Sequence, residues 1–212
     1  MEGEELYEFP RFVYDENTRI HTLDKKIIPS VSNIVEPVSR DYSKCHPEKL
    51  KRKRDIGIAF HEAIRLYLNN DLEEESLDER LVIPMQQFRE WWTDDEFKGV
   101  PLPTLIAIET PFCNEKLKYC GKPDLITEDT IYDWKLREYD PCCDPLRMSG
   151  YAGLIPDFQP KRKIVVEFSL DTGYRVHNAE KRQTWPMFRK LLDWYWKKKE
   201  LDTLLANWRK DR

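Results

Sequence analysis

The strongest structural signal in this chain comes from two neighbouring segments, Tyr119-Cys120-Gly121-Lys122-Pro123-Asp124-Leu125-Ile126 and Ile131-Tyr132-Asp133-Trp134-Lys135-Leu136. The turn-forming residues between them, 127–130, predict that the two segments are adjacent strands. Side chains alternate along a strand, so Asp133 and Lys135 share a face while Trp134 points away. If the strands pair as a hairpin, Asp124 converges on that face. Two carboxylates beside a lysine suit a divalent cation and an activated water; a solvated surface hairpin is the alternative.

Length and composition predict a water-soluble chain. Its 212 residues suffice to bury a sizeable core. Charged residues make up 35% of the chain, the mean hydropathy is -0.73, and no apolar run reaches the length that spans a membrane. The acidic first residues, 1–5, have neither the basic nor the apolar region of a signal peptide. We therefore expect an intracellular, cytoplasmic protein.

The charge pattern limits the kind of nucleic-acid contact that this chain can make. A net charge of -4 argues against a surface that coats nucleic acid everywhere, and it leaves room for a local basic groove. Residues 49–54 contain five cations, which form either a solvated helix face or phosphate contacts. The five cysteines include no CxxC pair, so reduced thiols are expected.

Hydrophobic periodicity and turn residues predict the order of the elements. Helices are expected over residues 55–69, 78–93 with an interruption or bend near Pro84, 145–154 and 180–208, and strands over 104–112, 117–126, 131–136, 164–170 and 174–177. The segment before residue 45 is expected to be mostly loop, with a strand at 12–14 and a short helix capped by Ser30 or Ser32. This order indicates an α/β fold with a central mixed β-sheet flanked by helices. We expect one domain over residues 1–212, with an N-terminal extension over 1–50 and a helical insert at about 78–98.

Two further residues are candidates for the same site. His61 lies on the first long helix, one turn after Gly57, whose missing side chain lets a ligand approach that face. A structural or exposed histidine is the alternative. Glu109 ends the strand before the hairpin, and it is either an ordinary exposed strand residue or a carboxylate that points at the site.

These motifs together resemble the PD-(D/E)XK nuclease superfamily, in its RecB-type and phage-type exonuclease branch. The resemblance rests on Gly57-x-x-x-His61, Pro123-Asp124 and Asp133-Trp134-Lys135, and the order of elements extends it from residue 28 to about residue 194. It implies a restriction-endonuclease-like core, with the elements in the order α-β-β-β-α-β-β-α. It also implies a bacterial or phage-infected host cell.

The resemblance further implies a metal-dependent DNA nuclease. Asp124, Asp133 and Lys135 would be catalytic. Mg²⁺ or Mn²⁺ would be held by His61, Asp124, Asp133 and the backbone carbonyl of Trp134, with Glu109 in support. An imidazole beside carboxylates favours Mn²⁺ without excluding Mg²⁺. The expected activity is exonucleolytic hydrolysis that leaves 5′-phosphates, in DNA recombination, repair or replication.

The expected partner is DNA, single-stranded or with a free end, together with a recombination or replication protein. Tyr151 matches a DNA-contacting tyrosine of the resembled branch, and Arg147 stands where that branch carries glutamine. A guanidinium still binds phosphate. Arg52, Lys53 and Arg54 are further candidates for DNA contact. No iron–sulfur cluster is expected, because no cysteine follows Cys143.

Two other functions stay open from the sequence. Besides an active nuclease, the sequence allows a catalytically inactive nuclease-fold module that binds nucleic acid. It also allows an interaction protein in which the Asp–Lys hairpin is an ordinary part of the surface. The sequence leaves open exonuclease against endonuclease activity, polarity, strand preference, RNA tolerance, the number of metal ions and the oligomeric state.

Overall fold

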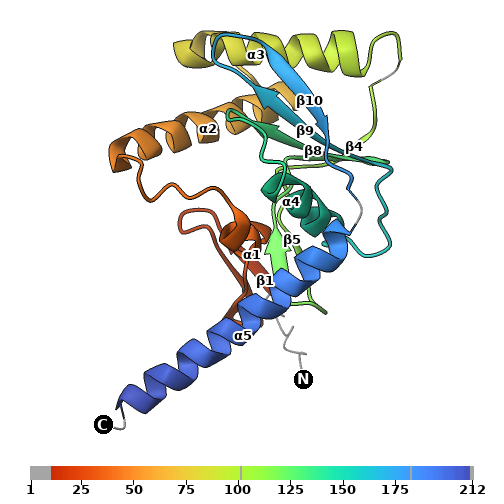
Figure 1. Cartoon of the computed structure of the whole chain (residues 1–212). Coiled ribbons are helices and arrows are strands. Elements are labelled where there is room, and N and C mark those ends of the chain that lie inside the picture. Colours follow the sequence, from red (N-terminus) through yellow and green to blue (C-terminus); the bar gives the residue numbers. More distant parts are fainter. Residues whose placement is uncertain (1–10, 101, 182, 211–212) are drawn as a thin grey trace, which may run out of the picture.

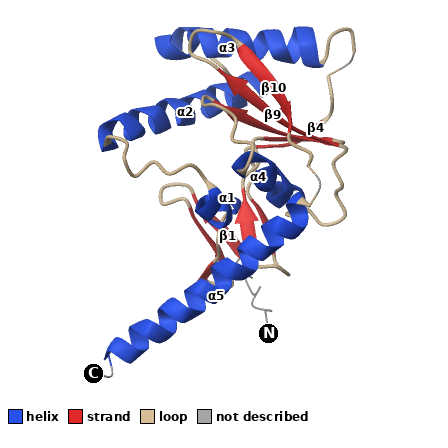
Figure 2. Ribbon diagram, in the orientation of Figure 1, coloured by secondary structure: helices blue, strands red, loops and turns tan. Residues whose placement is uncertain are grey.

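A five-stranded mixed β-sheet lies at the centre of the computed structural model, which describes residues 11–100, 102–181 and 183–210 (Figures 1 and 2). The strand order is β10-β9-β8-β7-β4. Strands β8 and β9 are parallel, and the other neighbours are antiparallel. The strands are β4 (Leu105–Ile108), β7 (Leu125–Thr127), β8 (Thr130–Lys135), β9 (Arg162–Phe168) and β10 (Tyr174–Asn178). The expected mixed sheet is thereby confirmed.

The described residues form five α-helices, which cover the sheet and link it to two small sheets. They are α1 (Val31–Val35), α2 (Pro47–Leu68), α3 (Val82–Arg89), α4 (Cys143–Ala152) and α5 (Thr184–Lys210). Helix α5 packs on α4 and α1, and its C-terminal half extends away from the rest of the chain (Figure 1). No described helix is both long enough and apolar enough to cross a membrane.

The alternation of side chains along the strands divides the core into two layers. Tyr132 and Trp134 of β8 pack with residues of α2 and α3, including Phe60 and Phe88. Ile131 lies in the other layer, with residues of α1, α4 and α5. The expected divergence of Trp134 from Asp133 and Lys135 is confirmed, since alternate residues of a strand point to opposite faces.

The N-terminal segment is more ordered than the sequence indicates. The expected strand at 12–14 is confirmed as β1 (Phe12–Asp15), and β2 (Ile20–Leu23) and β3 (Lys26–Ile27), which the sequence did not indicate, join it in an antiparallel meander; residues 1–10 of the expected extension lie outside the described residues. The second turn of the meander has Asp24 and Lys25 at positive φ, a conformation that a glycine-based turn signal overlooks. Ser30 caps α1 through a reciprocal hydrogen-bond pair with Asn33, which confirms the first of the two expected caps.

Two of the expected long strands are each interrupted once, at adjacent places. The two expected strands pair with each other as an antiparallel two-stranded ribbon. Within the central sheet the ribbon consists of β4 and β7, and beyond the interruption it continues as β5 (Phe112–Asn114) paired with β6 (Tyr119–Gly121). The register is the same on both sides of the break, and the Glu109 N–H still donates to the Asp124 carbonyl across 2.9 Å. The ribbon therefore leaves the central sheet at this break, where Pro111 and Pro123 both lack the N–H that a ladder needs.

Helix boundaries differ from the expected ones for reasons of capping. Helix α2 begins at Pro47 and not at Asp55, because proline is well suited to the first turn of a helix. The cations at 49–54 therefore lie within α2. The expected interruption near Pro84 is present, because a 3₁₀ turn (Glu79–Leu81) ends just before α3, whose first turn contains Pro84. A π-helical stretch (Glu90–Glu96) follows α3. Helix α5 begins at Thr184, four residues later than expected.

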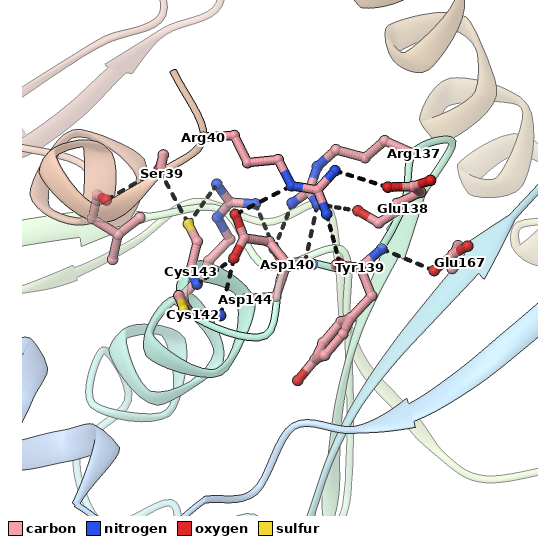
Figure 3. A network of polar contacts seen from close by, with 12 residues as sticks. Ser39, Arg40, Arg137, Glu138, Tyr139, Asp140, Cys142, Cys143, Asp144 and Glu167 are labelled. Carbon is pink, nitrogen blue, oxygen red and sulfur yellow. Dashed lines mark hydrogen bonds and ion pairs between the residues drawn. The ribbon is translucent and has the colours of Figure 1, made fainter. Parts of the chain in front are cut away.

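A buried polar network fixes α4 against the end of β8 (Figure 3). The carboxylate of Asp140 accepts hydrogen bonds from the N–H groups of Cys142 and Cys143, the first residues of the helix region. Asp144 is fully buried and accepts from Arg137 and from the Asp140 N–H. These bonds satisfy orphan N–H groups at the helix start and tie α4 to the segment that follows β8.

Removal of the Asp144 carboxylate should destabilise the fold strongly. Asp144→Ala leaves Arg137 in a mostly buried site without its counter-charge, at a cost of about 3 kcal/mol. Glu138 is a matched control, because its ion pair with Arg40 is exposed and Glu138→Ala should cost about 1 kcal/mol or less. Urea unfolding measures both values. Equal losses in the two variants would contradict the anchoring role of Asp144.

Candidate metal centre

The break in the ribbon determines where Asp124 lies. One step beyond the paired residues Leu125 and Tyr132, Asp124 comes opposite Asp133. The next backbone partner of Trp134 would be Pro123, where the chain leaves the sheet. The Trp134 N–H instead donates to Oδ2 of Asp124 across 2.6 Å. The Asp124 carboxylate thereby satisfies a buried backbone donor, and this bond fixes its orientation.

Glu109 is held beside Asp124 by an unusual backbone conformation. Its φ of 46° lies in the left-handed region, which is uncommon for a residue with a side chain. One oxygen of its carboxylate lies 3.0 Å from Nδ1 of His61, and the other lies 3.1 Å from Nζ of Lys122. Strained non-glycine residues gather at functional sites, and this outlier is in contact with two candidate groups.

His61 completes a group of three donors from three elements. Its neighbours Phe60 and Ile64 are buried in the core, so α2 is fixed in rotation and His61 faces the end of the sheet. Its Nδ1 lies 3.2 Å from Oδ1 of Asp124 as well as close to Glu109. The nitrogen of His61 and one oxygen each of Glu109 and Asp124 lie within 4.8 Å of one another.

The electrostatics of this group correspond to two buried carboxylates that share a cation. Burial lowers the pKa of His61, but the carboxylates of Asp124 and Glu109 outweigh that effect and raise it to about 10. Burial raises the pKa of Asp124, and the nearby charge of Asp133 raises it further, against the opposing effect of His61. For Glu109, burial acts upward, but His61 and Lys122 prevail and lower the pKa.

Lys135 and Asp133 form a second group next to the first. Asp133 is almost fully buried, and its carboxylate is in ion-pair contact with Nζ of Lys135. That ion pair involves Oδ2, whereas Oδ1 of Asp133 has no hydrogen-bond partner among the described residues. Asp133 is not part of the three-donor group, although its charge acts on Asp124 across the paired strands.

The donor set fits a divalent cation. Carboxylate oxygens suit Mg²⁺ and Mn²⁺, and one imidazole beside them favours Mn²⁺. The incompletely hydrogen-bonded carboxylate of Asp133 is a further polar group that a cation would satisfy. In the structure the role of that cation falls to the protonated His61, whose pKa is raised by the same carboxylates.

A cleft of about 570 Å³ gives access to this centre. His61 and Glu109 line it, and so do Arg54, Lys122 and Tyr151. Gly57 also lines it, and no atom lies within 4 Å of the position that its Cβ would take. The glycine therefore leaves open space on the helix face that carries His61, as the spacing of the two residues predicts.

The residues expected to contact DNA are only partly brought together. Tyr151 and Arg54 line the cleft. Arg147 is mostly buried on α4 and contacts Asp144 at 3.4 Å. The α2 residues 54, 57, 58 and 61 line the cleft, and their spacing of three and four places them on one face of the helix. Arg52 and Lys53 lie on other faces of α2 and do not line the cleft.

The backbone N–H of Trp134 donates to Asp124, and the expected metal contact of the Trp134 carbonyl stays a prediction. Other cleft residues did not emerge from the sequence. Lys122 belongs to the quoted Gly-Lys-Pro-Asp motif, and its position beside Pro123-Asp124 was the available signal. Tyr14, Arg19 and His21 come from a meander whose short strands carry weak patterns.

Comparison of the sequence with protein-family models and with curated proteins gives no match. The assignment of a function therefore depends on the site itself.

The raised pKa of His61 predicts a pH-dependent stability in EDTA. A group whose folded pKa lies above its unfolded value of 6.5 stabilises the fold fully below that value, and this contribution is lost as pH rises through about 10. The difference in unfolding free energy between wild type and His61→Gln should therefore shrink between pH 6.5 and 10. Urea unfolding across this range measures it, and a constant difference would contradict the shared-cation arrangement.

Proposed function

We propose that this chain is a metal-dependent phosphodiesterase of the PD-(D/E)XK nuclease class. More specifically, it is a RecB-type or phage-type DNA exonuclease that leaves 5′-phosphates, in recombination, repair or replication. The observation that carries the proposal is the convergence of His61, Glu109 and Asp124 near the Asp133–Lys135 pair, with His61 and Glu109 lining a cleft. Titratable groups with strongly shifted pKa values gather at functional sites.

The order of elements supports a restriction-endonuclease-like core. Apart from α3, which falls in the expected helical insert, and β5 and β6, which extend the ribbon outside the central sheet, α2 precedes β4, β7 and β8, helix α4 follows, and β9, β10 and α5 complete the series. This series agrees with the α-β-β-β-α-β-β-α order that the resemblance implies. Asp124 and Asp133 are buried where the chain leaves the central sheet before β7, and His61 and Glu109, which contact or neighbour Asp124, line the cleft.

A bound Mg²⁺ or Mn²⁺ would supply Lewis-acid stabilisation of the charge that develops on the phosphate oxygens. His61, Glu109 and Asp124 would hold it, and Asp133, which lies outside this group, would act on it through its charge. His61 must give up its proton before its nitrogen can serve as a ligand, so binding of the cation releases that proton.

Lys135 acts on the attacking water. Its ammonium is fixed by Asp133 and is mostly buried, with an exposed side-chain fraction of 13%. Hydrogen bonding from Nζ to the water oxygen orients the nucleophile and favours loss of its proton to solvent. Attack on phosphorus breaks the bond to the 3′-oxygen, which takes up a proton, and leaves a 5′-phosphate and a 3′-hydroxyl.

The cations around the centre hold the substrate backbone. Arg54 and Lys122 line the cleft together with His61 and Glu109, and Lys122 is in contact with Glu109. Arg147 lies deeper, with its guanidinium close enough to Asp133 and Tyr151 for their charges to influence it. Phosphate contacts of this kind position a DNA strand without reading its sequence.

An inactive nuclease-fold module that binds nucleic acid is the alternative function. It would keep the cleft cations and bind DNA without a metal. The intact set of His61, Asp124, Asp133 and Lys135 favours the enzyme, because a module under no catalytic constraint has no need for a buried lysine–carboxylate pair.

Substitution of Lys135 tests the enzyme directly. With Mn²⁺ and end-labelled single-stranded DNA, Lys135→Ala should reduce the cleavage rate by about a hundredfold or more. Lys163 is a matched control on the adjacent strand β9: its exposed side-chain fraction is 15%, and it too contacts a carboxylate, Glu180. Lys163→Ala should cleave at the wild-type rate. EDTA should abolish cleavage in every variant, and a Lys135→Ala protein as fast as wild type would refute the assignment.

The mode of cleavage follows from a comparison of substrates. An exonuclease degrades a linear strand from its end and leaves a closed circle intact, whereas an endonuclease cuts both. We expect wild type with Mn²⁺ to leave circular single-stranded DNA uncut while it degrades the linear form. Gel electrophoresis of both substrates distinguishes the outcomes, and cleavage of the circle at the same rate would identify an endonuclease.

A further inference from the structure

The three-stranded meander β1–β3 forms one wall of the cleft, facing α2. Tyr14, Arg19 and His21 line the cleft from the meander, whereas Arg54 and Gly57 line it from α2. The meander is attached to the small sheet β5–β6 through a separate apolar cluster. Its position beside the candidate metal centre gives this N-terminal segment a place in substrate binding that the nuclease motifs alone do not supply.

The aromatic rings of the meander form a stack that reaches the cleft. Tyr14 lies directly across from His21 in the paired strands. The ring centroids of Tyr14 and His21 are 4.6 Å apart, with the ring planes at 29°. Phe12, two residues before Tyr14 on β1, also stacks on His21, with 6.0 Å between the ring centroids. Tyr14 is only half-buried, and Lys122 lies 5.8 Å from the centre of its ring. The stack thus ends at an aromatic ring beside a cation.

His21 supplies a second, independent sign of a ligand. Its exposed fraction is 8%, it lines the cleft, and its Nε2 has no hydrogen-bond partner in the described part of the chain. Buried polar groups in folded proteins nearly always have a partner, so an unpartnered nitrogen at a cleft indicates a polar ligand. The edge of a nucleobase carries suitable donors and acceptors.

Two cations mark the path of a backbone across the cleft. Arg19 is exposed at the turn between β1 and β2, and Arg54 is exposed on α2. Arg54 has only a loose contact, at 3.8 Å, with the exposed Asp55. Both guanidinium groups are thus available to phosphates, on opposite walls of the same cleft.

We propose that Tyr14 and His21 form a stacking platform for an unpaired base of single-stranded DNA, whose backbone is held by Arg19 and Arg54. The choice of ligand rests on the proposed nuclease function. Bases within a duplex are covered by their neighbours, so an aromatic side chain can stack only on a base that is unpaired. The platform therefore selects a single strand and places its next phosphodiester toward His61 and Glu109.

The test is anisotropy of labelled DNA with the full chain in EDTA, so that no cleavage interferes. Tyr14→Ala should bind a single-stranded oligothymidylate between about fivefold and about a hundredfold more weakly than wild type. Tyr14→Phe keeps the ring and should bind as wild type does. Val13→Ala is the strand control, because Val13 is exposed and does not line the cleft. An abasic strand of the same length should bind wild type and Tyr14→Ala equally.

The phosphate contact is tested separately at the turns of the meander. Arg19 and Lys25 are both exposed and both have positive φ, so substitution by alanine should affect the stability of the backbone turn similarly at the two positions. Only Arg19 lines the cleft. Arg19→Ala should weaken binding of intact and abasic strands alike and reduce the salt dependence by about 0.7 in the logarithmic slope. Lys25→Ala should leave both unchanged.

The results separate this inference from the proposed function. Equal binding by wild type and Tyr14→Ala, or an equal loss on intact and abasic strands, overturns the platform. Blunt duplex bound as tightly as the single strand overturns the selection of unpaired bases. Cleavage by wild type with Mn²⁺ is measured independently: its absence with the binding pattern intact refutes the nuclease and leaves the platform.

Discussion

The site depends on one local constraint, the need of the buried Trp134 N–H for an acceptor at the place where Pro123 takes the chain out of the central sheet. Asp124 provides that acceptor with one carboxylate oxygen. Its other oxygen is thereby directed toward His61. A folding requirement and a ligand orientation are thus met by one side chain, because a buried backbone donor without a partner would be costly.

The same break in the ribbon assembles the rest of the centre. Both of its strands leave the sheet together and keep their register, which places Glu109 beside Asp124 and brings Lys122 against Glu109. The carboxylates that gather there are buried, and buried like charges need a cation. The carboxylates raise the pKa of His61 to about 10, so at neutral pH its imidazolium, together with the Lys122 ammonium, balances their charge.

Much of the central fold could be predicted from the sequence, because strong hydrophobic patterns dominate there. The strand 130–135, the divergence of Trp134 from Asp133 and Lys135, and the helix that carries His61 all follow from side-chain periodicity. Of the meander, sequence patterns predicted only the strand at 12–14; they did not predict β2 and β3, which span four and two residues, or the start of α2 at Pro47. The role of Lys122 and the left-handed backbone of Glu109 depend on the break in the ribbon, which is a tertiary feature.

The most direct test of the central claim is a crystal of the protein soaked with Mn²⁺ and measured at the manganese absorption edge. The account predicts an anomalous difference peak within coordination distance of Nδ1 of His61 and of carboxylate oxygens of Glu109 and Asp124, the three groups that lie within 4.8 Å of one another. It also predicts that the peak disappears in Asp124→Asn crystals. A peak elsewhere, or no peak while His61 keeps its contacts with both carboxylates, would show that these groups form a structural ion-pair cluster and not a metal centre.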